Sequence, residues 1–142
     1  MPASAIDVAQ ECFVVGRLGE LAGWAHSPST ASALWPGLSV TVEQDRGAEG
    51  VRWAVSGPLV GTAEIWLEPY GDGVLVHCYL RADRVGRPLR RAAALRMKRK
   101  WQRHLTGRLW ELKDRTEAGR TPGTAGQVGG YGVKPTPSDA EA

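Results

Sequence analysis

The sequence predicts an α+β domain in which a curved antiparallel sheet wraps around one long C-terminal helix. Residues 87–117 show helical periodicity over the longest stretch of the chain. Four runs of alternating apolar side chains precede this stretch within residues 38–82, and the connections between them are short enough to favour antiparallel pairing. The chain has 142 residues, of which 42% are hydrophobic, so it can bury one core.

The predicted helix begins near Arg87, has Pro88 in its first turn, and ends before Gly119 and Pro122. Its apolar side chains recur at intervals of three, four and seven residues. They would share one face: Ala94, Met97, Trp101, Leu105 and Leu112, flanked by Ala93 and Leu109. At about 1.5 Å per residue the helix would be ~46 Å long. A domain of this size has an expected radius of gyration of ~13 to 14 Å, so the helix would be longer than the domain is across. We therefore expect it either to overhang the body or to bend at Thr106-Gly107.

The alternating runs predict strands at residues 38–43, 51–56, 59–68 and 74–82, and Gly71-Asp72-Gly73 is a hairpin signal between the last two. Before them we expect a short strand at residues 5–8, a buried helix at 11–22 and a linker at 29–33. The alternation turns one set of apolar side chains toward the long helix: Val40, Val42, Val51, Trp53, Val55, Ala63, Ile65, Leu67, Val74, Val76, Cys78 and Leu80. Trp66 and Tyr79 fall on the opposite, polar face, where we expect cross-strand neighbours to shelter them.

Residues 1–118 are predicted to form the domain, and the Gly- and Pro-rich residues 119–142 are predicted to be a disordered tail. The chain contains no apolar run long enough to span a membrane and begins without a signal-peptide pattern, which predicts a cytoplasmic protein. Cys12 and Cys78 have no metal-ligand spacing, and the histidines lie far apart. We expect reduced cysteines, no metal and no cofactor; either a monomer or a homodimer fits the sequence.

The positive charge of the chain is concentrated in the predicted long helix. Residues 87–117 contain eleven Lys or Arg and three acids, whereas the rest of the chain contains seven basic and twelve acidic residues. A basic amphipathic helix could bind nucleic acid or an anionic membrane surface, but its outer face could also be simply solvated. We favour the solvated interpretation, which makes nucleic acid an unlikely partner.

The order of elements and three stretches of sequence resemble the helix-grip fold of the START-like, or SRPBCC, superfamily. The stretches are AIDVAQECFVVGRLGELAGWAHSPS, GVRWAVSGPLVGTAEIWLEPYGDGVLVHCYLRAD, and the helix from RPLRR to KRKWQRHLTGRLWELKD, which together cover about residues 5–117. They are most similar to the polyketide cyclase/dehydrase branch, in particular to small actinobacterial members. The resemblance implies a hydrophobic pocket between the sheet and the long helix. Full members have six or seven strands, so we expect an abbreviated sheet here.

Three functional hypotheses follow. The resemblance implies that an apolar small molecule, lipid- or polyketide-like, binds in the pocket, for which the candidate residues are Trp24, Trp53, Val55, Ile65, Leu67, Val76, Leu80, Met97 and Trp101. It also implies a second possibility, a cyclase or dehydratase, which would need a proton-transferring group. His26, near Trp24, and His77, near Tyr79, Glu64 and Arg52 on neighbouring strands, are weak candidates for that role. The third hypothesis is an interaction protein that uses its basic helix.

Overall fold

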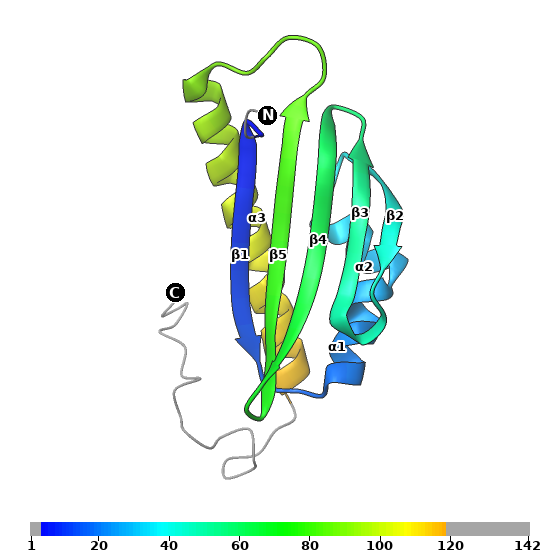
Figure 1. The fold of residues 1–142 in the computed structure, drawn as a ribbon. Coiled ribbons are helices and arrows are strands. Elements are labelled where there is room, and N and C mark those ends of the chain that lie inside the picture. The colour runs from blue at the N-terminus through cyan, green and yellow to red at the C-terminus, as the bar shows by residue number, and fades with distance from the viewer. Residues whose placement is uncertain (1–3, 119–142) are drawn as a thin grey trace.

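A computed structural model of the chain describes residues 4–118. Five strands form one antiparallel sheet in the order β1-β5-β4-β3-β2, and a long helix, α3, follows the last strand (Figure 1). The strands are β1 (Ile6–Val14), β2 (Ser39–Asp45), β3 (Gly50–Ser56), β4 (Leu59–Tyr70) and β5 (Gly73–Arg84). The helices are α1 (Leu18–His26), α2 (Pro28–Leu34), the 3-10 turn η1 (Gly47–Glu49) and α3 (Arg91–Glu117). This confirms the predicted α+β helix-grip architecture with an antiparallel sheet and a long C-terminal helix.

The core lies between the concave face of the sheet and the three helices. α1 and α2 cover the part of the sheet formed by β3 and β4, and α3 lies alongside β1 (Figure 1). Most of the side chains predicted to face the helix are buried, including Val51, Ile65 and Leu80. Val42 is 56% exposed although it pairs with the buried Trp53; it lies on the edge strand β2, just before a register shift in the pairing with β3.

The chain before residue 35 differs from the prediction. β1 continues through Cys12 and Phe13 to Val14, which pairs with Val74, so a helix at 11–22 is wrong for its first half. Polar Gln10 hides the alternation of this strand, since it lies on the inward face and accepts a hydrogen bond from Thr106 of α3 at 3.0 Å. The expected linker at 29–33 is instead part of helix α2, which begins with a proline and buries Leu34.

The long helix begins later than predicted. Arg84 donates from Nε and Nη2 to the carbonyl oxygens of Arg87 and Pro88, at 2.9 and 3.2 Å, so these carbonyls are not used in a helical turn. The first helical bond instead runs from the Ala94 amide to the Arg90 carbonyl, 2.8 Å away. α3 then continues unbroken through Gly107 to Glu117, so of the two expected alternatives, an overhang or a break at Thr106-Gly107, the break does not occur.

The hairpin signal is confirmed, because Tyr70 pairs with Gly73 across a two-residue turn in which Gly71 has φ +59°. β4 extends two residues beyond its expected end and includes Pro69.

No helix within residues 4–118 combines the length and the apolar character needed to cross a membrane. The predicted tail, residues 119–142, lies outside the described residues.

Candidate functional site

The two halves of α3 are buried to very different extents. Leu105, Leu109 and Leu112 in its second half are at most 3% exposed, whereas Met97 and Trp101 in its first half are only partly buried. The second half thus completes the core, whereas the apolar side chains of the first half pack against the core on one side and stay partly exposed on the other. The space beside this first half is the candidate site.

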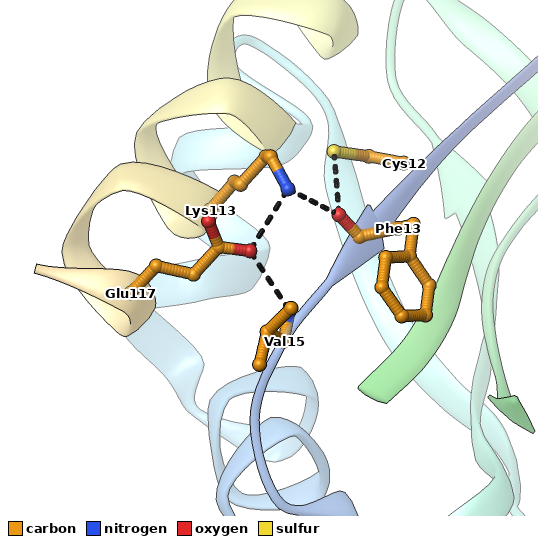
Figure 2. Close-up of polar contacts among 5 residues, drawn as sticks. All are labelled: Cys12, Phe13, Val15, Lys113 and Glu117. Carbon is orange, nitrogen blue, oxygen red and sulfur yellow. Dashed lines mark hydrogen bonds and ion pairs between the residues drawn. The ribbon is translucent and has the colours of Figure 1, made fainter. Parts of the chain in front are cut away.

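A polar cluster fixes the end of α3 to the end of β1 (Figure 2). The buried Lys113 ammonium donates to the Phe13 carbonyl and to Glu117 Oε2, both at 2.8 Å, and the Val15 amide donates to the same carboxylate oxygen at 2.8 Å. Because Lys113 is only 6% exposed, its charge needs these partners. The cluster anchors the helix at one end and so determines the position of its other end. Burial raises the pKa of the nearby Cys12 thiol to about 11, which keeps it protonated.

A cavity of about 980 Å³ lies between the first half of α3, the loop after α2, the turn between β3 and β4, and the segment that leads from β5 into α3. The volume is in the range of small-molecule sites. Its apolar walls are formed by Pro36, Leu38, Pro58, Leu59, Leu89, Ala93, Met97 and Trp101. Five basic side chains also border it: Arg84, Arg96, Arg99, Lys100 and Arg103.

Aromatic contacts hold the inner wall of the cavity. Trp35 is 1% exposed and packs against Trp53 and Trp101, with ring centroids 5.9 and 6.2 Å apart. His104 also lines the cavity; its Nε2 donates to the Ala33 carbonyl at 2.9 Å, and its ring meets Trp101 edge to face at 5.7 Å. The His104 bond ties α3 to α2, so this wall has a fixed geometry.

Two of the nine predicted ligand-binding side chains, Met97 and Trp101, line this cavity. Trp24 lies on α1, partly buried and packed against the core. The other six pack inside the hydrophobic core and do not line the cavity: Trp53, Val55, Ile65, Leu67, Val76 and Leu80. Alternation shows which face a strand residue occupies, but not whether neighbouring side chains fill the space in front of it.

His26 is placed at the junction of α1 and β2, away from the cavity lining. Its Nδ1 lies 2.8 Å from the Ala22 carbonyl oxygen, and its Nε2 lies 3.0 Å from Asp45 Oδ1. The Ala22 carbonyl and, to a smaller extent, the Asp45 carboxylate raise the pKa of His26 above its ordinary value. The hydrogen bond from the Gly47 amide lowers the pKa of Asp45, and His26 lowers it further by a smaller amount. His26 therefore joins α1 to the end of β2.

His77 lies on the convex face of the sheet and is 8% exposed. Its ring stacks on Trp66 at 4.5 Å and lies parallel to Tyr79 at 6.2 Å, while Nε2 and Nδ1 lie 3.1 and 3.3 Å from carboxylate oxygens of Glu68 and Glu11. These neighbours shelter Trp66 and Tyr79, as predicted. Since both ring nitrogens already face carboxylates and the cavity is on the opposite face of the sheet, His77 has no access to a ligand there.

Sequence reasoning missed several side chains that border the cavity. His104, Leu38, Leu59 and Leu89 come from four separate segments, and only the fold brings them together. One sequence feature indicates the basic border of the cavity: between Asp83 and Glu111 there are ten Lys or Arg and no Asp or Glu. Five of these ten border the cavity.

No protein-family model and no curated protein sequence matches the chain. Several solved structures share its fold. The Aha1 dimer from Colwellia psychrerythraea has a TM-score of 0.56 and 12% identity, and the match covers 82% of this chain and 99% of that one. DR_A0006 from Deinococcus radiodurans has a TM-score of 0.58 and 14% identity, with 80% and 98% of the two chains covered. The di-domain ARO/CYC protein StfQ of the steffimycin biosynthetic pathway also has a TM-score of 0.58 and 14% identity, over 81% of this chain and 52% of that one.

At 12 to 14% sequence identity, these matches show a shared fold and no more. They agree with the five-stranded sheet and long terminal helix described above. The chain therefore has the helix-grip fold that its resemblance to the START-like superfamily implied.

Proposed function

We propose that the protein binds an apolar small molecule, lipid- or polyketide-like, in the cavity beside the first half of α3. The observation that carries the proposal is the cavity itself, which has about 980 Å³ of space and predominantly apolar walls. Leu59 from the sheet, Leu38 from the loop after α2, and Met97 from α3 approach it from three sides. A ligand there would remove the remaining exposed apolar surface of the half-buried Leu38 and Met97 from water, which contributes about 25 cal/mol per Å².

The test is titration of the protein with Nile red, an uncharged dye that fluoresces in apolar surroundings. Saturable binding of one dye per chain is expected. Substituting Ala93, which lines the cavity, by Phe should fill part of the space and weaken binding about tenfold, that is by ~1.4 kcal/mol. Ala92→Phe is the matched control, because Ala92 is exposed on α3 and does not line this cavity. Equal affinities in the two variants, or no saturable binding, would contradict the proposal.

A cyclase or dehydratase activity is the second candidate. His104 favours it, because histidine is the side chain that most often transfers protons in enzymes and His104 lines the cavity. Its ring is oriented by the Ala33 carbonyl and by Trp101. Incubation with a thioester-linked polyketone should give a cyclised product, and His104→Gln should lower the rate at least tenfold while the dissociation constant of Nile red stays unchanged. Equal rates in both proteins would remove His104 from the mechanism.

A further inference from the structure

We propose that the ligand of this cavity is an amphiphile with an anionic head group, such as a carboxylate or a phosphate ester, whose head lies among the basic side chains at the rim. The inference rests on the proposed function and narrows it to a chemical class. Its basis is the charge around the cavity, which is entirely of one sign among the described lining residues.

The rim carries Arg84, Arg96, Arg99, Lys100 and Arg103, and no Asp or Glu is among the lining residues. Arg96 and Lys100 are spaced one helical turn apart on α3. Each directly precedes a residue of the apolar wall, Met97 and Trp101 respectively. The charged and the apolar parts of the site are thus neighbours along one helix. This pairing matches a molecule that has a charged head and an apolar body.

Within residues 4–118, the rim charges also lack acidic partners. Some arginines elsewhere on the described surface pair with acids: Arg52 with Glu64 at 3.7 Å, Arg81 with Asp7 at 3.5 Å, and Arg108 with Glu111 at 2.6 Å. None of the five rim residues has an acidic partner within 4 Å among residues 4–118. Arg84 is held in place by the Arg87 and Pro88 carbonyls, which leave its positive charge unneutralised. Like charges gathered beside a low-dielectric wall raise the local positive potential and attract an anion.

A polyanion such as DNA is a poorer match to the same features. It would contact the basic side chains through phosphates but leave Met97, Leu59 and Trp101 unused, since phosphate contacts are made on an open surface. An amphiphile uses both parts of the site. The cavity also has the volume of a small-molecule site, and a DNA duplex is too wide to enter it.

The experiment measures displacement of Nile red by three compounds that share a ten-carbon chain, each kept below the concentration at which it aggregates: decanoate, decanol and decyltrimethylammonium. Decanoate should bind about tenfold more tightly than decanol, and the cationic compound most weakly. The advantage of decanoate should shrink in 0.5 M NaCl, because salt screens exposed charges. Equal affinity for decanoate and decanol would overturn the inference and leave the proposed function intact; absence of displacement by all three would contradict both.

The double variant Arg96→Gln/Lys100→Gln should lose most of the preference for decanoate while its affinity for decanol stays within about twofold of the parent. The matched control is Arg91→Gln/Lys98→Gln, which removes the same charge from α3 at positions that do not line this cavity. Equal losses in the two double variants would show a general charge effect and overturn the inference. The same conclusion would follow if inorganic phosphate or a DNA duplex displaced Nile red as well as decanoate does.

Discussion

At the scale of single residues, the structure depends on positions where the backbone of one element lies against another. Gly61, the third residue of β4, is one such position. A Cβ atom added there would overlap the backbone carbonyl of Arg81 on the neighbouring strand. Glycine in a strand commonly marks such a close approach between backbones. Gly61 also lies near Leu59, where β4 borders the cavity.

Gly61→Ala should therefore destabilise the fold by about 2 to 4 kcal/mol, because a backbone atom cannot move aside as a flexible side chain can. Urea unfolding followed by circular dichroism measures the change. Gly19→Ala is the control: a Cβ at Gly19 meets nothing within 4 Å, and the position is helical. That variant should be more stable than the parent by ~0.5 to 1 kcal/mol. Similar destabilisation of both variants would argue against the described pairing of β4 and β5.

His26 gives a pH-dependent contribution. Only the protonated imidazole has an N–H on each nitrogen, and so only this form can donate to both the Ala22 carbonyl and Asp45. The pKa of His26 is raised in the folded protein above its ordinary 6.5. Its stabilising contribution is therefore fully present below about pH 6.5 and is lost as the pH rises through the folded-state value.

The expected result is that His26→Gln lowers the free energy of unfolding more at pH 5.5 than at pH 8.5. The difference should be small, because the pair is exposed to solvent. Unfolding curves at the two pH values in the parent and the variant give the comparison. The pH dependence should be reduced in Asp45→Asn, which weakens the same interaction. A larger effect of His26→Gln at pH 8.5 would contradict the assignment.

At the scale of elements, periodicity in the sequence predicted the helix and four strands because their buried faces are continuous. Residues 51, 53 and 55 of β3 and 105, 109 and 112 of α3 are buried as their spacing requires. Only the first part of β1 was predicted, since Gln10 interrupts the apolar alternation of its inward face. The inward Gln10 is satisfied by Thr106 of α3, a contact that no local pattern reveals. The start of α3 was misplaced because Arg84 binds the carbonyls that a longer helix would use.

Lys113→Met tests the cluster that joins α3 to β1. The methionine would keep the apolar stem but leave the Glu117 carboxylate and the Phe13 carbonyl without the ammonium, which should cost about 2 to 3 kcal/mol of unfolding free energy. The control is Arg115→Met, at an exposed position two residues later in the same helix. Adding Glu117→Gln to Lys113→Met should recover part of the loss, because the uncompensated charge is removed. Equal stability of Lys113→Met and the control would show that the cluster contributes little.

At the scale of the whole molecule, the fold was predictable from sequence but the candidate site was predictable only in part. Two wall residues, Met97 and Trp101, were predicted because they share a face of the long helix. Six predicted ligand contacts are core residues, because α1, α2 and the second half of α3 fill the space above the sheet. Which part of a concave face stays open depends on where α3 leaves the sheet, and this is a property of the assembled domain.

The domain boundary is a last prediction at this scale. Every described helix and strand lies between Ile6 and Glu117, and Glu117 takes part in the last tertiary contacts described, with Val15 and Lys113. A chain ending at residue 118 should therefore unfold cooperatively with a Tm within about 2 °C of the full-length protein, a change of less than ~0.5 kcal/mol. A chain ending at residue 110 should fail to fold, because it lacks Leu112, Lys113 and Glu117. A large drop in Tm on removing residues 119–142 alone would place the boundary beyond residue 118.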